Sequence, residues 1–339
     1  MRRYRNRILI GLVLGFGVIV VTMLASDISQ LRQQAVAFPW AIMIPVLVLR
    51  VANWGLRFIK WHYYLHAVGV RDIRADDSAA IFISGFVLSL SPGKAAEALK
   101  SLVVKGLTGA PIAATLPVVA AERLSDGIAV LLLLTVSIGM LAANEYWPVV
   151  FVSLIFFALL IGILQVRPLC LWLLGQAEHL PLLKRIAGPL RTFYESSYAI
   201  VRWRTLLIAV GLGTAANLLD GVGVYLILQG IGLPATLETF FQALLVISLS
   251  VIVGSVSALP GGLGAADLSI GVTLSVVVGL GTSAAGFVTL LARFVQLWWG
   301  VLVGMGVGFV FRRRLLGPLM EAESAAEPAD YFTDSVVAR

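Results

Sequence analysis

Apolar residues form blocks along the chain that are long enough to cross a bilayer, and polar residues gather between the blocks. A crossing helix needs about 20 mostly apolar residues. Six blocks come close to or exceed this length, and each predicts a full transmembrane helix: residues 8–25, 39–60, 112–140, 147–166, 205–229 and 283–311. The pattern predicts an all-α polytopic membrane protein.

Two further apolar segments are interrupted by proline and glycine. Residues 79–106 break at Ser91-Pro92-Gly93, and residues 238–279 break at Leu259-Pro260-Gly261-Gly262. Because proline and glycine end helices, each segment is predicted to be a re-entrant helical hairpin that enters and leaves on one side. The first hairpin's arms are too short to cross, whereas the first arm of the second is long enough to leave a crossing open.

The two interrupted segments begin one repeated pattern. Glu97 is followed 26 residues later by Arg123, and Asp267 is followed 26 residues later by Arg293. The gapless alignment also pairs identical residues: Gly109 with Gly279, Ala114 with Ala284 and Val118 with Val288. Interrupted segments at corresponding positions of two halves are the sequence signature of a transporter's binding site.

Three predicted crossings, residues 112–140, 147–166 and 205–229, separate the two hairpins that begin the repeat units 79–140 and 238–311. An odd number turns the second unit upside down, so we predict an inverted repeat with two opposed hairpins. Basic residues mark the cytoplasmic side of a membrane protein. Those assigned to that side are Arg2, Arg3, Arg5, Arg7, Arg57, Lys60, Arg71, Arg74, Lys105, Arg167, Lys184, Arg185, Arg191, Arg202, Arg204 and Arg312 to Arg314. Among the basic residues, only Arg32 lies in a predicted outer loop. This asymmetry of positive charge between the two sides requires that both hairpins re-enter or that both cross.

This arrangement predicts a multi-pass protein of a prokaryotic plasma (inner) membrane, with both termini cytoplasmic. Residues 1–317 form one transmembrane domain, within which residues 168–204 mix apolar and basic side chains. That segment is predicted to lie along the inner leaflet and to bind anionic headgroups. Residues 318–339 are acidic and alanine-rich, and predict a disordered cytoplasmic tail.

Composition excludes an ordinary soluble domain, because 59% of residues are hydrophobic and 13% are charged, against about 25% charged in soluble domains. The net charge of +7 is spread over segment ends, so no nucleic-acid partner is expected. The single cysteine, Cys170, excludes an intramolecular disulfide framework. His62 and His66 are interpreted as packing at the membrane edge. No cofactor, metal or soluble catalytic motif is expected, and the oligomeric state is open.

Eight charges fall inside the predicted hydrophobic segments: Arg50, Glu97, Glu122, Arg123, Asp126, Asp220, Asp267 and Arg293. Each costs roughly 2.5–3.5 kcal/mol at a helix centre. The sum, about 20–28 kcal/mol, exceeds a typical net stability of about 5–15 kcal/mol. The charges must therefore be paired, neutralised, near an edge or in a wet cavity. Arg123 and Asp126 are spaced for a local pair, and Glu122 and Asp126 share a helix face and can share a proton.

Helix starts at the two breaks point amide groups into the membrane, and such ends bind anions. The predicted substrate-binding residues are Pro92, Gly93, Lys94, Glu97, Lys100, Glu122, Arg123, Asp126, Pro260, Gly261, Gly262, Gly264, Asp267 and Arg293, with Arg50, Asn217 and Asp220 as additional candidates. Structural alternatives stay open. The acids can cap helices, the arginines can form ion pairs, and Asn217 and Asp220 can join helices by hydrogen bonds.

The motifs at residues 91–100, 121–127 and 259–267, with the late Arg293, resemble those of the lysylphosphatidylglycerol synthase transmembrane, or flippase-like, family. The resemblance spans roughly residues 8–315. The family's first motif usually reads Pro-Gly-x-x-Gly-Glu-x-x-Arg, and its second carries a glutamate. Here Ala96 replaces the glycine, Lys100 the arginine and Asp267 the glutamate, which puts the substrate in doubt.

Larger family members fuse this region to an aminoacyl-transfer domain that is not found in the sequence given. The resemblance therefore implies movement of an anionic or modified (glyco)phospholipid between leaflets, with any lipid-modifying enzyme encoded separately. Two alternatives remain. One is an integral-membrane enzyme or accessory protein in glycolipid, polyprenyl-phosphate or hopanoid synthesis, with the membrane acids as acid or base. The other is an ion or small-solute transporter.

Overall fold

The computed structural model describes residues 28–89, 95–141, 165–178, 202–257 and 259–315, together with isolated residues at 17, between 151 and 163, and at 200. Within these ranges the chain is helical and contains no strand. The α-helices are α2 Ile28–Ala37, α3 Met43–Ala67, α4 Ala75–Leu88, α5 Ala95–Thr108, α6 Ile112–Leu141, α8 Arg167–Glu178, α10 Trp203–Gly230, α11 Leu237–Val256, α12 Ala265–Val276, α13 Thr282–Arg293 and α14 Trp299–Val310. Two short 3₁₀ turns, η1 Trp40–Ile42 and η3 Pro260–Gly262, and a π-turn, η4 Phe294–Trp298, complete the described elements.

Five of the described helical segments are long and apolar enough to cross a membrane: 40–67, 115–141, 203–230, 237–256 and 282–310. Four of them correspond to predicted spans, and the polytopic helical architecture is confirmed. The fifth is α11, the first arm of the second predicted hairpin, for which the sequence left open whether it crosses the membrane. The predicted spans 8–25 and 147–166 lie wholly or partly outside the described residues, so the count of six stays a prediction.

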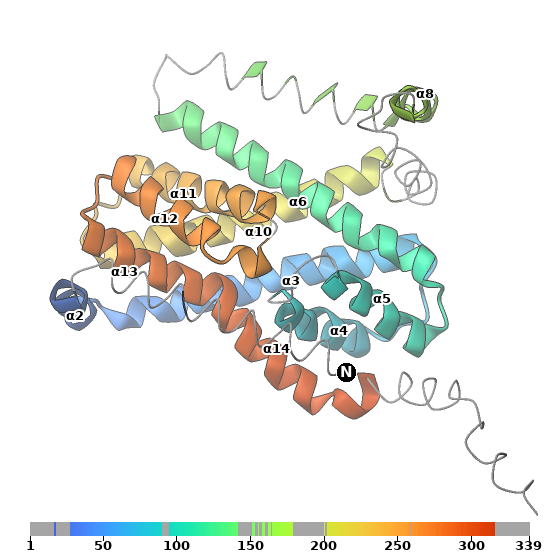
Figure 1. Cartoon of the computed structure of the whole chain (residues 1–339), viewed down its shortest axis with the longest axis horizontal. Coiled ribbons are helices and arrows are strands. Elements are labelled where there is room, and N and C mark those ends of the chain that lie inside the picture. The colour runs from blue at the N-terminus through green and yellow to red at the C-terminus, as the bar shows by residue number, and fades with distance from the viewer. Residues whose placement is uncertain are drawn as a thin grey trace, which may run out of the picture.

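Helices α4 and α5 form one antiparallel pair, and α11 and α12 form another (Figure 1). Gly85 of α4 lies directly against the side chain of Lys100 in α5. In the second pair, Gln242 near the start of α11 donates to the carbonyl oxygen of Val277, just past the end of α12, at 3.2 Å. In Figure 1 the open ends of the two pairs face opposite ends of the long axis. With 14 residues each, α4 and α5 span only about 21 Å at about 1.5 Å per residue.

The two halves of the chain exchange packing partners. The long helix of the first half, α6, packs against α11, and α14 of the second half packs against α4. Gly300, Gly304 and Gly308 form the contact face of α14; a Cβ on Gly304 would lie 2.8 Å from the carbonyl oxygen of Ile83 in α4. Helices α3 and α10 lie antiparallel beside this assembly and run along its long axis (Figure 1).

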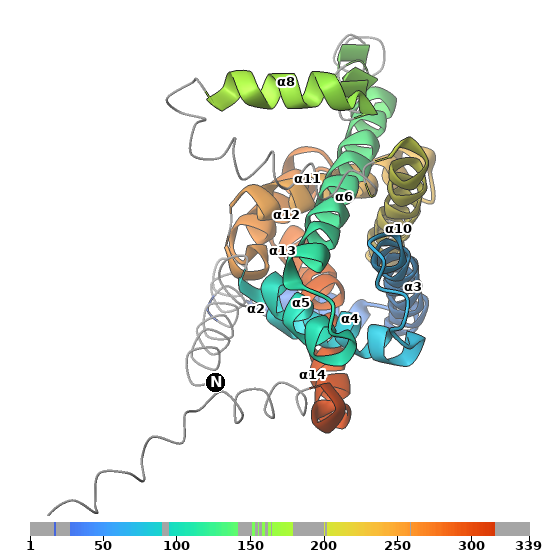
Figure 2. The same ribbon diagram turned by 90° about the vertical axis from the view of Figure 1, so that its right-hand side faces the viewer.

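The connections gather at the two ends of the long axis. One end of the long axis carries residues 68–74, residues 109–111 and the start of α10. The other end carries residues 231–236 and 277–281 (Figure 1). Helix α8 is seen end-on in Figure 1 and along its length in Figure 2, so it runs across the direction of α3 and α10. This is the orientation expected of an interfacial helix whose neighbours cross the bilayer.

Charged residues join α4 to the end of the chain's last long helix. Arg314 contacts Asp76 at 3.0 Å and Asp77 at 2.7 Å. Arg74 also contacts Asp76 at 3.1 Å. The hydrogen bond from Arg74, helped by that from Arg314, holds the pKa of Asp76 below its ordinary value. The contact with Asp76 is exposed, whereas Asp77 is buried, and both lie at the end of the α14–α4 interface.

Candidate functional site

The second break is a tight turn that places the start of α12 inside the helical assembly. Gly261, Gly262 and Gly264 have φ values of 58°, 64° and 82°, which favour glycine. Gly262 also packs on the backbone of Gly254 in α11, where a Cβ would lie 2.9 Å from the Gly254 Cα atom. The prediction that Pro260 and the following glycines end one helix and begin another is confirmed.

Asp267 and Arg293 join this turn to α13. The guanidinium Nε of Arg293 donates to Oδ1 of Asp267 at 2.9 Å, and its Nη2 donates to the carbonyl oxygen of Gly261 at 2.9 Å. The other carboxylate oxygen of Asp267 accepts from the backbone N–H of Gly264 at 2.9 Å. Asp267 therefore caps α12, as the glutamate of a capping box does. The predicted acid cap and the ion pair within the repeat are both confirmed.

The ion pair is buried, yet one nitrogen of the Arg293 guanidinium has no hydrogen-bond acceptor among the described residues. Only 7% of Arg293 is exposed. Its Nη1 group makes no hydrogen bond within the part of the chain that the structure describes. A guanidinium presents five donors in a plane and binds carboxylate or phosphate oxygens in pairs. The turn therefore holds a cation with a spare donor beside a helix start.

The first break lies outside the described residues, and with it Pro92, Gly93 and Lys94. Glu97 falls at the third position of α5, the place that Asp267 takes in α12, but its side chain is also outside the description. The predicted convergence of Glu97 with Asp267 is thus untested. Arg123 lies on α6 and is exposed. The Lys100 ammonium lies 5.1 Å from the ring centres of both Trp61 and Phe82, in cation–π geometry.

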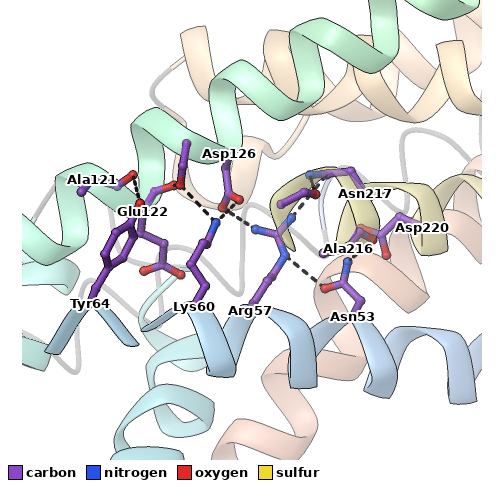
Figure 3. A network of polar contacts seen from close by, with 12 residues as sticks. Asn53, Arg57, Lys60, Tyr64, Ala121, Glu122, Asp126, Ala216, Asn217 and Asp220 are labelled. Atoms are coloured by element: carbon purple, nitrogen blue, oxygen red, sulfur yellow. Dashed lines mark hydrogen bonds and ion pairs between the residues drawn. The ribbon is translucent and has the colours of Figure 1, made fainter. Parts of the chain in front are cut away.

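A polar face of α3 forms a second cluster, of which the sequence prediction included Arg50 but not Asn53, Arg57 or Lys60. Arg50, Asn53, Arg57 and Lys60 follow one another at intervals of three and four residues, so they lie on one side of the helix. Arg57 binds Asp126 of α6 at 2.5 Å, and Lys60 binds the other oxygen of the same carboxylate (Figure 3). Lys60 is 0% exposed. The sequence predicted that this span ends near residue 60, whereas α3 continues to Ala67. The burial of Lys60 was therefore not predicted, and the assignment of Arg57 and Lys60 to the cytoplasmic side stays a prediction.

Arg57 also links α3 to α10. Its Nε donates to Oδ1 of Asn53 at 3.1 Å, and its Nη2 donates to Oδ1 of Asn217 at 3.3 Å. Asn53 in turn donates to the carbonyl oxygen of Ala216 at 2.6 Å, and Asn217 to that of Gly213 at 2.7 Å. The prediction that Asn217 hydrogen-bonds across helices is confirmed. Figure 3 shows the resulting network between α3, α6 and α10.

Glu122 faces the same cluster from one turn earlier on α6. It is 6% exposed, and its carboxylate makes no hydrogen bond with any described residue. Figure 3 shows this carboxylate between Tyr64 and Lys60, on the side of α6 that also carries Asp126. The prediction that the two acids share a helix face is confirmed, whereas the sharing of a proton is not tested.

Arg50 and Asp220 form a third buried pair, between α3 and α10. One guanidinium nitrogen contacts both carboxylate oxygens, at 2.8 and 2.9 Å, and the other donates to the carbonyl oxygen of Gln296 at 2.7 Å. Gln296 lies in the π-turn η4, and a small pocket beside it is lined by Arg50, Asp220 and Val46 among others. In the register of the repeat, Gln296 corresponds to Asp126. In each half, the residue at this position accepts a hydrogen bond from an arginine of α3: Asp126 from Arg57, and the carbonyl oxygen of Gln296 from Arg50.

Apolar helices joined by buried ion pairs define a polytopic α-helical membrane protein. The family model of the lysylphosphatidylglycerol synthase TM region matches residues 8–304. The chain belongs to this family of membrane proteins that act in lipid metabolism or transport, and the predicted resemblance is confirmed. No curated protein matched the chain.

Proposed function

We propose that the protein is a lipid transporter that moves an anionic or modified phospholipid between the two leaflets, without catalysing a reaction. The observation that carries this proposal is the buried Asp267–Arg293 pair at the start of α12. Family membership supports a lipid substrate. The charge of Arg293, its spare donor and the nearby helix amides all suit a phosphate group.

In this proposal Arg293 always has an anionic partner. A buried guanidinium left without one is strongly destabilising. When no lipid is bound, Asp267 provides the negative charge at 2.9 Å. An arriving phosphate first binds the Nη1 group and then competes with Asp267 for the rest of the guanidinium. The carboxylate keeps its hydrogen bond to Gly264, so the helix start stays capped while the lipid headgroup is held.

We further propose that the two hairpins are re-entrant and form an inverted repeat. The exchange of partners between α6–α11 and α14–α4 supports this arrangement, as do the opposite directions of the hairpins in Figure 1. In such a repeat the first break, with Lys94, Glu97 and Arg123, supplies the second half of the headgroup site. The end of the molecule that carries residues 68–74 would then face the cytoplasm of a prokaryotic cell.

The test is lipid movement in reconstituted vesicles. The protein is placed in phosphatidylcholine vesicles containing phosphatidylglycerol with a fluorescent acyl chain, and a membrane-impermeant reductant reports how much probe reaches the outer leaflet. Wild-type protein should move the probe faster than empty vesicles do. Arg293→Gln should abolish this movement, whereas the matched control Arg32→Gln, an exposed residue of α2, should retain it.

Asp267→Asn separates transport from a purely structural role for the pair. Because it frees Arg293 from its competitor, this variant should bind phosphatidylglycerol more tightly than wild type while moving it more slowly. Equal loss of binding in Asp267→Asn and Arg293→Gln would show that the pair only maintains the fold. A wild-type rate no faster than that of empty vesicles would overturn the proposal itself.

A further inference from the structure

Two residues that line the pocket between α3, α10 and η4 each carry a hydrogen-bond donor without an acceptor. The donors are Nε of Arg50 and Nε2 of Gln296; both atoms are buried, and neither has a partner among the described residues. The rest of the Arg50 guanidinium is bound, with Nη1 donating to Asp220 and Nη2 to the carbonyl oxygen of Gln296. Because an unpaired buried donor is costly, such groups nearly always have a partner, either protein or ordered water.

Asp220 supplies an acceptor at the same pocket. Each of its carboxylate oxygens accepts one hydrogen bond from Nη1 of Arg50, at 2.8 and 2.9 Å. An ionised carboxylate has about four lone-pair sites, so Asp220 can accept further hydrogen bonds. The pocket thus offers two donors and one acceptor, which come from α3, η4 and α10. A ligand that bonds to all three must both accept and donate hydrogen bonds.

The pocket is small and much of its wall is apolar. The volume that the centre of a water molecule can occupy is about 10 Å³, and a cavity needs about 10–15 Å³ to hold one water. Val46, Val224 and Ile227 form part of the wall. A phosphate group, with its four oxygens, is too large for this volume. A buried water typically makes about three hydrogen bonds, which is the number that the polar groups of the pocket offer.

The charge of the pocket favours a neutral ligand. Arg50 and Asp220 form a neutral pair, so an added ion would leave one net charge among membrane-spanning helices, where charge is costly. The unpartnered groups are donors, whereas hard cations require several oxygen ligands. We therefore propose that the pocket binds one water molecule, which accepts from Nε of Arg50 and Nε2 of Gln296 and donates to Asp220. This proposal goes beyond lipid transport and does not depend on it.

The water connects the π-turn to two helices of the first and second halves. Gln296 is the middle residue of η4, and Arg50 already holds its carbonyl oxygen at 2.7 Å. A water on its side-chain amide adds a second link to Arg50 and a first link to Asp220 of α10. The π-turn, an interruption of regular helical hydrogen bonding, is then held through both the main chain and the side chain of one residue.

Gly223 of α10 offers a way to displace the water with one methyl group. It lines the pocket, and a Cβ there has one contact within 4 Å outside its own helix, with Cγ1 of Val46 at 3.6 Å. Gly223→Ala should therefore fill the pocket without a clash. Gly211→Ala is the matched control, because it lies on the same helix and its Cβ meets nothing within 4 Å. Gln296→Met removes the Nε2 donor and keeps the carbonyl oxygen that Arg50 binds.

The experiment is radiolytic labelling of the full chain in detergent. A short X-ray pulse converts water into hydroxyl radicals, which oxidise adjacent side chains, and mass spectrometry locates the oxidised residues. Val46 is 1% exposed and lines the pocket, so wild type should be oxidised there. Val288, which is 0% exposed and does not line the pocket, is the internal reference. In Gly223→Ala and Gln296→Met the oxidation of Val46 should fall to the level of Val288, whereas Gly211→Ala should retain it.

Thermal unfolding gives a second readout, because a wet and a dry pocket predict opposite signs. Both alanines gain helix propensity, and filling a dry cavity adds stability. Displacing a water instead leaves buried donors unpaired, so Gly223→Ala should melt at a lower temperature than Gly211→Ala. Replacing chloride by gluconate should change neither readout, since the ligand is not a halide.

Four results would overturn the inference. They are oxidation of Val46 in wild type no faster than that of Val288, undiminished oxidation in Gly223→Ala or Gln296→Met, a melting temperature of Gly223→Ala at or above that of Gly211→Ala, and oxidation of Val46 that depends on chloride. The first and third would show that the pocket is dry, and the last that it binds an anion.

Discussion

Replacing Asp126 with asparagine removes the carboxylate that both Arg57 and Lys60 bind. The variant keeps the size of the side chain but leaves two buried cations beside Glu122 alone, and the cluster gains one net positive charge. Lys60 is the more affected cation, because it is 0% exposed and its other hydrogen bond, to Ser125, is long at 3.3 Å. The prediction is a large loss of stability that arises from unpaired charge, with little loss of apolar packing.

The magnitude follows from the contacts. A hydrogen bond to a charged group contributes about 1.5–3 kcal/mol, so the two bonds to Asp126 together suggest about 3–6 kcal/mol. Removal of one partner of a buried pair costs about 3–5 kcal/mol. Asp126→Asn should therefore reduce the free energy of unfolding by about 3–5 kcal/mol. Since about 1.4 kcal/mol is a factor of ten, the unfolding equilibrium constant should rise by about two to four orders of magnitude.

The measurement is reversible unfolding in mixed detergent micelles, followed by tryptophan fluorescence. Lys60→Met should cost less than Asp126→Asn, because Asp126 keeps its bond to Arg57 and only one charged contact is lost. Lys60→Met should also recover part of the loss in the Asp126→Asn background, with a coupling energy of about 0.5–3 kcal/mol. Asp76→Asn, in an exposed pair, should cost about 0–1 kcal/mol. A loss in Asp126→Asn as small as that in Asp76→Asn would refute the reasoning.

Two further predictions concern packing and topology. Gly304→Leu should lower the free energy of unfolding by about 1–3 kcal/mol through overpacking, since a Cβ there meets the Ile83 carbonyl oxygen at 2.8 Å. Gly306→Leu, where a Cβ meets nothing within 4 Å, should stay within about 0.5 kcal/mol of wild type, and equal losses would contradict the contact. Single cysteines at Thr236 and Thr282 in a Cys170-free background should both react with an impermeant thiol reagent from outside. Reaction of only one of them from that side would exclude the inverted arrangement.

Local rules were enough to predict the second break and its cap. Pro260 and the glycines after it cannot continue a helix, and an acid three residues beyond Gly264 lies where the free amides are. The repeated spacing marked Asp267 and Arg293 as candidates for an ion pair, one of the alternatives that the sequence left open. Each of these features depends on residues close in sequence or on a pattern present twice in the chain.

Arg57 and Lys60 were missed as members of the α3 cluster because the positive-inside rule counts basic residues without placing them on a helix face. Arg57 and Lys60 were therefore treated as edge charges, although they continue the three-and-four spacing that starts at Arg50. Their partner Asp126 is more than 60 residues away in the chain, and one sequence gives no means of pairing them. Because α3 continues to Ala67 through several polar residues, both side chains lie inside the helix and not at its end. The hydropathy pattern alone did not indicate this.

The π-turn η4 makes the two halves unequal. A π-turn holds about one residue more than an α-helical turn, so it rotates the helix that follows by about 100° relative to a regular helix. In the first half the corresponding residues, 124–128, continue α6 without interruption. The register shared by Asp267–Arg293 and Glu97–Arg123 is therefore lost in the helix that follows the π-turn, from Trp299 onward. A conformational exchange in which each half adopts the other's shape would not return an equivalent molecule. In the proposed transport cycle, the states open to the two faces of the membrane would therefore differ in energy, and the protein would have a preferred resting side.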